Sequence, residues 1–551
     1  MRFCRTCYST MGDEEEVCHS CGTRRQGSSS STVLSKKTTP PLRVATKQAP
    51  PIATAEFEKP TETTSGELSS RIVLSRRTIE RVVVPALLLA ILAVKLWLSL
   101  QFRLAIWDGY SYLANAHAFL LGRAPDPYHF FELFRPPFLP YIISLIWRVT
   151  GENYDVATLV QPTFTVAAGY VLFLLLKEMF DLKCAVVASL LLSIAPTVFY
   201  WTNQILEGGI AMFFLTLAMY LLWLGIERNE RFLPFSAAAL ALGTLSRYTT
   251  LVLLPVFPIM LLVLWMAYRK TRRFPWTSFA LMIIVFFLLW APWFYWNYLY
   301  EGSPFASLIS ASFYEATGPT GPWYFYIVNV PDFLTIPGSI LLFVGLADKR
   351  TISDRKRLVL LLWLVTLFAF HTLLVHKEER YSIEWTPALA AFAGLGFSRI
   401  EAHLPSRTKI LAWLVVALWL TASFYPAVTY SVSAAKNQVL SYGSVDEFTS
   451  LSNWITTNTN SMTRGATDIP TALAYQTDRY YYNIWVLAGM AQNQDVTTDH
   501  FLSTINVTLI VVSPATSQTL GFQNDPNLAL VKQFPNYDIY LYRCLNCTQH
   551  T

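Results

Sequence analysis

Residues 82–100 read VVVPALLLAILAVKLWLSL, with Lys95 as the only charged residue, and residues 279–296 read FALMIIVFFLLWAPWFYW with no charge at all. An apolar run of about 20 residues matches the thickness of a bilayer core. Of the 551 residues, 53% are hydrophobic and only 14% are charged, whereas soluble proteins carry roughly 25% charged residues. Mean hydropathy is +0.37. These features exclude a soluble enzyme or a disordered chain and predict a polytopic α-helical membrane protein.

Similar apolar runs recur along the chain, and they predict about eleven membrane-spanning helices, or up to thirteen if short apolar segments also cross. The expected spans are 81–101, 155–176, 184–201, 206–226, 232–247, 249–268, 277–297, 334–347, 358–375, 382–398 and 410–428. Residues 137–149 are apolar but too short for a normal span, so we expect a helix at the membrane interface there.

The distribution of basic residues predicts the orientation of these spans. With the N-terminus in the cytoplasm, every short, strongly basic loop falls on the cytoplasmic side, as the positive-inside rule requires. These loops carry Lys177 and Lys183; Arg228 and Arg231; Arg269, Lys270, Arg272 and Arg273; Lys349, Arg350, Arg355, Lys356 and Arg357; Arg399, Arg407 and Lys409. The net charge of +6 is spread over the chain and gives no sign of nucleic-acid binding.

Composition divides the chain into four parts. Residues 1–23 form a Cys-containing head, and residues 24–78 form a Ser-, Thr-, Pro- and Lys-rich stretch that we expect to be a flexible linker. No secretory leader is expected in the first 80 residues, because they lack an apolar core segment. Residues 79–428 form the membrane domain. Residues 429–551 alternate strand-like and helix-like pieces, with strands expected at 507–512 and 537–542, and predict a small extracytoplasmic α/β domain.

The head carries two Cys-x2-Cys pairs, Cys4 with Cys7 and Cys18 with Cys21. Two such pairs place four thiolates tetrahedrally around Zn²⁺, and a cytoplasmic head favours reduced thiols over disulfides. We therefore expect a zinc ribbon with a structural Zn²⁺, serving as a fold element or as a docking site for a cytoplasmic partner. A small zinc ribbon fused to a membrane domain indicates a prokaryotic, archaeal-like protein, so we expect this protein in the cell membrane of a prokaryote. Near the C-terminus, the Cys544 and Cys547 pair is left open between a disulfide and free thiols.

Several charged residues gather on the predicted outer side without serving as cytoplasmic anchors. They are Asp108, Arg135, Glu207, Arg247, His376, Lys377, Glu378 and Arg380. Ionisable groups at membrane depth are costly, and they usually face a cavity or a pathway. The economical interpretation is one shared outer cavity.

The sequence around these residues resembles the GT-C superfamily of membrane glycosyltransferases, which use polyprenyl-phosphate-linked sugars. The matching segments are Trp107-Asp108-Gly109-Tyr110, Arg135-Pro136-Pro137, Leu245-Ser246-Arg247-Tyr248 and His376-Lys377-Glu378-Glu379-Arg380-Tyr381. The hexapeptide resembles a motif of dolichyl-phosphate-mannose-dependent mannosyltransferases. The first loop resembles the protein-O-mannosyltransferase and aminoarabinose-transferase branch (glycosyltransferase family 39). The likeness spans about residues 100 to 400 and leaves out the head and the tail.

The resemblance implies a role for each of these residues. Asp108 is the candidate general base that activates the acceptor, and its alternative is a helix cap. The family usually has Asp-Glu at this place, and Gly109 replaces the second acid, so Glu207 is expected to assist or to hold a metal. The cations expected around the departing lipid phosphate are Arg135, Arg247, Lys377 and Arg380, joined by His376 and Tyr381. For the arginines, the alternative is snorkelling toward headgroups.

The resulting prediction is a glycosyltransferase that moves a hexose, such as mannose, from a polyprenyl or dolichyl phosphate to a hydroxyl on protein, lipid or glycan. Whether a divalent cation takes part is left open. Two alternatives from other classes are a lipid or small-molecule transporter or scramblase, and an anchored interaction protein whose zinc head binds a cytoplasmic partner. A transporter often shows internal repeats or broken helices at the midplane, and no repeat is visible.

Overall fold

The computed structural model describes residues 2–3, 10–11, 75–122, 134–271, 273–317, 320–436, 443–493, 502 and 506–542. In the head, β1 (Arg2–Phe3) pairs antiparallel with β2 (Thr10–Met11). The cysteines of the predicted zinc ribbon, nearly all of the linker, and Cys544 with Cys547 lie outside the described residues. The zinc ribbon, the linker and the state of the last two cysteines therefore stay predictions.

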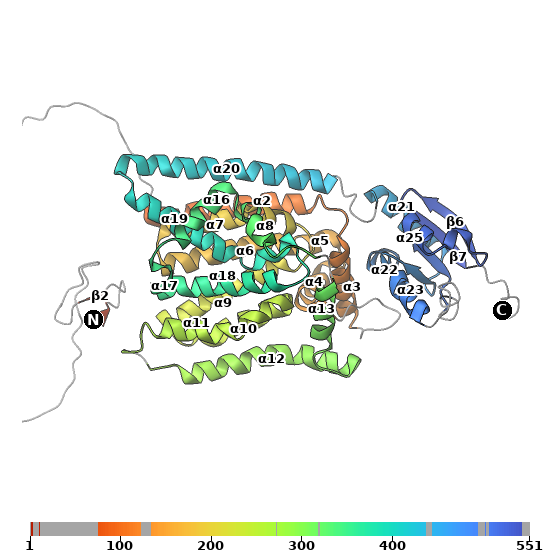
Figure 1. The fold of residues 1–551 in the computed structure, drawn as a ribbon, viewed down its shortest axis with the longest axis horizontal. Helices are drawn as coiled ribbons and strands as arrows, with labels where there is room; N and C mark the ends of the chain where they lie inside the picture. The colour runs from red at the N-terminus through yellow and green to blue at the C-terminus, as the bar shows by residue number, and fades with distance from the viewer. Residues whose placement is uncertain are drawn as a thin grey trace, which may run out of the picture. The chain divides into compact units, whose positions relative to one another are not determined.

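Six helices among the described residues are long and apolar enough to cross a membrane, and they occupy six of the predicted spans. They are α2 (Val84–Ser99) with α1 (Arg76–Thr78) and the π-helical η1 (Ile79–Val83) before it, α6 (Val160–Met179) with α5 (Tyr154–Thr158) before it, α9 (Gly208–Glu227), α12 (Trp276–Glu301), α18 (Arg355–Leu373) and α20 (Ser406–Lys436). The longest of them, α12 and α20, run in roughly the same direction as α18 (Figure 1).

The remaining spans correspond to shorter helices, several of them limited by proline. Residues 184–201 form α7 (Leu182–Ile194) and α8 (Pro196–Trp201), because Pro196 cannot continue the hydrogen bonding of α7. Residues 249–268 begin as a 3₁₀ turn, η2 (Tyr248–Leu253), before α11 (Val256–Trp265). The other predicted spans without a long helix contain α10 (Phe232–Ser246), α16 (Ile336–Leu346) and α19 (Thr386–His403).

The segments between the spans form helices of their own. Two of them, α3 (Trp107–Leu121) and α4 (Phe138–Thr150), lie at one end of the helix bundle (Figure 1). The region expected at the interface, 137–149, is α4. The others are α13 (Ala306–Thr317), α14 (Phe325–Val328), α15 (Val330–Leu334), α17 (Arg350–Ser353) and the 3₁₀ turn η3 (Glu379–Glu384).

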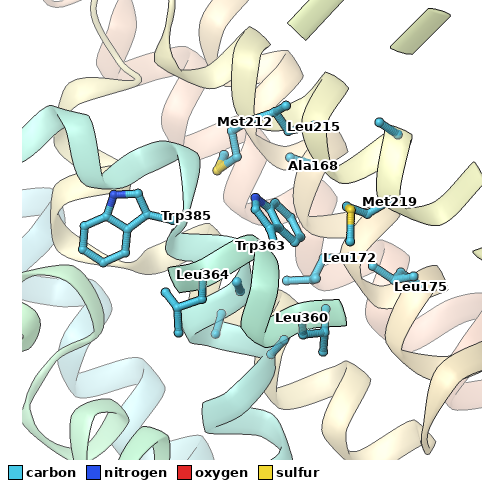
Figure 2. Packing of buried hydrophobic residues seen from close by; sticks show 14 of the residues in the cluster. Ala168, Leu172, Leu175, Met212, Leu215, Met219, Leu360, Trp363, Leu364 and Trp385 are labelled. Atoms are coloured by element: carbon cyan, nitrogen blue, oxygen red, sulfur yellow. The ribbon is translucent and has the colours of Figure 1, made fainter. Parts of the chain in front are cut away.

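The core of the bundle is built from large apolar side chains of several helices. Trp363 of α18 is fully buried and lies among side chains of α6 and α9, including Leu172 and Met219 (Figure 2). Trp385, at the start of α19, is also fully buried and packs edge-on against Phe333 and Phe368. This core fixes the ends of α9, α18 and α19, from which site residues project.

Helices α16 and α19 approach each other closely through two glycines. A Cβ on Gly345 would lie 2.0 Å from the carbonyl oxygen of Phe392, and a Cβ on Gly396 would lie 2.0 Å from that of Leu341. No side chain fits at such distances without moving a backbone. The contact positions α19, which follows directly after η3.

The C-terminal part contains a five-stranded mixed sheet with the order β4-β3-β5-β7-β6. Its elements are α21 (Val445–Asn458), β3 (Arg464–Thr467), α22 (Pro470–Thr477), β4 (Tyr480–Asn483), α23 (Ile484–Asn493), β5 (Leu509–Val512), α25 (Pro514–Thr519), η4 (Phe522–Asn524), β6 (Leu528–Phe534) and β7 (Tyr537–Tyr542). Strand β3 is parallel to β4 and β5, whereas β7 is antiparallel to β5 and β6. The boundary expected at 428/429 falls inside α20, which runs on to Lys436.

We expect Gly396→Ala to lower the thermal unfolding midpoint of the purified protein clearly, because the added methyl group overpacks a backbone contact at a cost of about 1–3 kcal/mol. Gly243→Ala in α10 is the matched control, since its Cβ meets only the flexible side chain of Leu215 at 3.3 Å and the nearby Leu215 backbone at 3.5 Å. Equal midpoints for the two variants would contradict the role given to this contact.

Candidate active site

A cavity of about 500 Å³ collects most of the charged residues expected on the outer side. Its polar lining consists of Asp108, Tyr112, Arg135, Glu207, Arg247, Tyr248, Thr249, Ser312, Arg380 and Tyr381. Its apolar wall comes from η2, α13 and the end of α18, with Leu251, Leu308, Phe370, Leu373, Leu374 and Val375. The cavity is therefore lined by charged side chains in one part and by apolar side chains in another.

Asp108 lies at the centre of the charged part of the cavity lining. It lies in the first turn of α3, whose N-cap is Ile106, and its carboxylate pairs with two arginines. Arg135 Nη2 donates to Oδ1 at 2.6 Å, and Arg380 Nη1 donates to Oδ2 at 2.5 Å. Only 2% of Asp108 is exposed. Burial by itself opposes ionisation, but the two guanidinium groups outweigh it and hold the pKa of Asp108 well below its usual range.

Glu378 extends this chain of charges. Its carboxylate accepts two hydrogen bonds from the Arg380 guanidinium and lies 2.8 Å from Nε2 of His376. Burial works against the charge of Arg380, but Asp108 and Glu378 outweigh it and raise the pKa of the guanidinium. Arg380 is thus held between two carboxylates.

Arg247 forms a second chain of charges that lines the same cavity. Its Nε lies 2.7 Å from Oε1 of Glu384 and 3.4 Å from Oε1 of Glu207. Glu207 also accepts a hydrogen bond from the Tyr112 hydroxyl at 2.7 Å. Arg247 is positioned because α10 ends one residue before it, so its side chain leaves the helix toward η3.

The two chains of charges meet at Tyr381. The guanidinium carbon of Arg247 lies 4.6 Å from the centre of its ring, and that of Arg380 lies 5.8 Å away. An aromatic face attracts such cations. The ring therefore keeps two guanidiniums of like charge near the same cavity.

Sequence reasoning missed Glu384 and Tyr112 as site residues. Glu384 is fully buried, accepts a hydrogen bond from the Thr249 hydroxyl at 2.7 Å, and lies 3.8 Å from His371. The predicted span 382–398 contained Glu384, and an ionisable residue inside an apolar span is itself a signal of function. Tyr112 follows Asp108 by four residues, and it is buried with its hydroxyl donating to Glu207.

Two of the residues expected at the phosphate lie outside the cavity lining. Lys377 donates to the carbonyl oxygens of Thr372 and Leu374, so its ammonium group caps the end of α18. His376 contacts Glu378 and pairs through its backbone with Thr320. Within the described ranges, no group of three or more His, Cys, Asp or Glu side chains is arranged to hold a metal ion.

The arrangement suits one kind of ligand chemistry. Three guanidinium groups face a cavity that also has an apolar wall, which matches an anion carried on a hydrocarbon chain. An ionised carboxylate lies among them and can accept a proton once its arginine partners are drawn away.

A comparison with protein families matches residues 134–296 to the dolichyl-phosphate-mannose-protein mannosyltransferase family. None of the curated proteins matches this chain significantly.

Solved structures match over a much longer stretch. ArnT from Cupriavidus metallidurans, bound to undecaprenyl phosphate, superimposes with a TM-score of 0.64 at 16% identity, over 83% of this chain and 97% of that one. The oligosaccharyltransferase of Archaeoglobus fulgidus gives 0.56 at 14% identity, over 77% and 69%. Its complex with an inhibitory peptide and a dolichol-phosphate gives 0.54 at 14% identity, over 78% and 69%. The chain therefore shares the fold of these proteins, and together with its long apolar helices this supports the polytopic membrane protein that the sequence predicted.

We expect the stability contributed by Asp108 to be insensitive to pH between 7 and 5. The pKa of a folded-state carboxyl paired in this way lies below its unfolded value of about 3.9, so the contribution is complete above that value and is lost as pH falls through the folded-state pKa. The measurement is the difference in thermal midpoint between wild type and Asp108→Asn across this range, with the exposed Asp155→Asn as control. A difference that shrinks between pH 7 and pH 5 would show that Asp108 is not held ionised.

Proposed function

We propose that the protein is a membrane glycosyltransferase that moves a hexose, such as mannose, from a polyprenyl or dolichyl phosphate to a hydroxyl on protein, lipid or glycan. The observation that carries the proposal is the Asp108 carboxylate held between Arg135 and Arg380 at the wall of a cavity with an apolar side. ArnT bound to undecaprenyl phosphate and the archaeal enzyme bound to a dolichol-phosphate share the fold and support a lipid-phosphate donor. Mannose is supported by the family match of residues 134–296 and by the resemblance of the hexapeptide at 376–381.

The donor phosphate would bind to the arginines and the prenyl chain would follow the apolar wall. Arg is suited to bidentate contact with phosphate oxygens. Arg247 lines the same cavity as Asp108 and is aligned by Glu384. As the bond between the sugar and the phosphate breaks, negative charge grows on the phosphate, and guanidiniums already in place stabilise that charge in the transition state.

Asp108 would act as the general base. The acceptor oxygen attacks the anomeric carbon, the bond from that carbon to the phosphate oxygen breaks, and the hydroxyl proton passes to the Asp108 carboxylate. A single displacement of this kind inverts the anomeric centre, and its transition state is oxocarbenium-like. Glu207, bound to Tyr112 and Arg247, would support the arginine side of the site.

Donor binding would also prepare this base. In the donor-free site, Arg135 and Arg380 lower the basicity of Asp108. A phosphate that draws these guanidiniums toward itself leaves the buried carboxylate with weaker partners, which raises its proton affinity. The base would therefore gain strength when the donor is present.

The orientation is part of the proposal. Asp108, Glu207, Arg247 and Arg380 surround one cavity, whereas the basic loops follow the opposite ends of the same helices, for example Arg228 after α9. By the positive-inside rule, the basic loops face the cytoplasm and the cavity faces outward, in a prokaryotic cell membrane. The C-terminal α/β domain would then be extracytoplasmic.

The zinc head is proposed as a separate cytoplasmic unit. Cys4 and Cys7 lie in sequence between the paired strands β1 and β2, an arrangement that suits a zinc knuckle. Four Cys ligands leave no open position, so the ion would be structural and the head would serve a cytoplasmic partner.

We expect Asp108→Asn to reduce sugar transfer by about 10²–10⁴, the usual contribution of a general base. The assay incubates purified protein with a panel of radiolabelled polyprenyl-phosphate sugars and follows label into the acceptor. Asp155→Asn, in the exposed first turn of α5, controls for the loss of an acidic residue. Unchanged transfer by a folded Asp108→Asn protein would remove Asp108 from the mechanism.

We expect one zinc ion per chain in the purified protein, and its loss in a variant with Cys18→Ser and Cys21→Ser, because a Cys₄ site does not survive the loss of two ligands. Elemental analysis measures the metal. Sugar transfer should be retained in this variant. Equal zinc content in both proteins would place the ion elsewhere.

A further inference from the structure

A second cavity, of about 610 Å³, lies between the bundle and the C-terminal domain. One wall comes from α3 and from Glu152, and the other comes from the start of β3, the end of α22 and the start of β4. The volume is within the range of roughly 300–1,000 Å³ that is typical of ligand pockets.

Helix α3 forms a wall of both cavities. Its first turns present Asp108 and Tyr112 to the active site, whereas His117, farther along, faces the second cavity. The rise of an α-helix is 1.5 Å per residue, so His117 lies about 14 Å along the axis from Asp108. The distance from a ligand in the second cavity to Asp108 is thus about the length of a few sugar units.

The two walls are held together by aromatic packing. Tyr110 of α3 is fully buried, and its ring lies 6.2 Å from that of Phe448 and 5.9 Å from that of Tyr475. Gln476 also donates a hydrogen bond to the Tyr110 hydroxyl at 3.4 Å. One apolar cluster contains residues of α3, α4, α21 and α22. The cavity therefore has fixed walls.

The lining mixes donors, acceptors and aromatic rings. His117 Nδ1 lies 2.8 Å from a carboxylate oxygen of Glu152, and Asp478 and Arg464 line the opposite side. Tyr475 and Tyr480 add two rings. The backbone behind this wall is held in place, because Arg479 donates to the carbonyl oxygens of Thr459 and Thr477.

The geometry points to an acceptor site in this second cavity, one that binds a neutral carbohydrate chain whose terminal hydroxyl reaches Asp108. The inference rests on the proposed glycosyl transfer and names its acceptor class. A hydroxyl both donates and accepts hydrogen bonds, which suits a lining with both kinds of partner. The faces of sugar rings carry C–H groups that pack on tyrosine. Basic and acidic side chains occur together here, so an anionic ligand has no clear advantage.

The experiment compares two tyrosines of one strand. Tyr480 lines the cavity, whereas Tyr482 lies two residues farther on the same strand, does not line it, and packs edge-on against the Tyr480 ring with 4.7 Å between the ring centres. Tyr480→Ala and the control Tyr482→Phe, which keeps this ring contact, are made in the full-length protein. Asp478→Asn is a third variant, because Asn tolerates the left-handed backbone of this residue (φ 52°).

The probes are neutral oligosaccharides of two to four hexoses and hydroxyl-bearing peptides of similar length. Binding is measured by calorimetry without donor, and transfer is measured with the labelled donor. We expect Tyr480→Ala and Asp478→Asn to weaken oligosaccharide binding and to raise the acceptor KM about tenfold. The kcat and the affinity for donor should stay within twofold, and Tyr482→Phe should match wild type.

Each outcome separates this inference from the proposed function. Oligosaccharide binding that depends on Tyr480, in a protein that transfers no sugar, keeps the site and overturns the transferase. Transfer with an acceptor KM that neither variant changes overturns the site and keeps the transferase. Peptide binding that depends on Tyr480, without oligosaccharide binding, overturns the carbohydrate class. Binding of no probe at all overturns the site.

Discussion

The double ion pair of Asp108 is the constraint on which the rest of the site depends. A buried carboxylate without partners would cost several kcal/mol, so α3 has to stay where Arg135 and Arg380 reach it. Arg380 is in turn held by Glu378, and its backbone carbonyl accepts from Arg247 at 3.4 Å. The pair therefore joins three segments that are far apart in the chain into one wall.

Each of the three guanidiniums of the site is paired with at least one carboxylate in the absence of a ligand. The carboxylates of Asp108, Glu207, Glu378 and Glu384 alternate with the guanidiniums of Arg135, Arg247 and Arg380. In the proposed reaction, an incoming phosphate would have to compete with these carboxylates for the same cations. That competition would link donor binding to the proton affinity of Asp108, as expected of a site that should not activate an acceptor before a sugar donor is present.

Packing explains why such a network can be maintained at the end of a membrane bundle. Helices α16 and α19 meet through glycine backbones, and large rings such as Trp385 fill the space beneath η3. Helix α3 is fixed on its other side by Tyr110 against the C-terminal domain. The same helix thus carries the proposed base on one face and a wall of the second cavity on another.

The sequence by itself determined the membrane class, the positions of most helices and five of the charged residues that line the cavity. Hydropathy and proline placement act over short stretches of chain, so they can be recognised from the local sequence. Two spans differ in detail: Pro196 divides the span 184–201 into two helices, and the helix of the span 382–398 begins only at Thr386. Only the tertiary structure decided which charged residues pair with one another. Asp108 and Arg380 are 272 residues apart, and no local pattern shows that Glu384 aligns Arg247 or that Lys377 caps α18. Pairing between buried charges depends on which helix ends the core brings together, and only packing sets that.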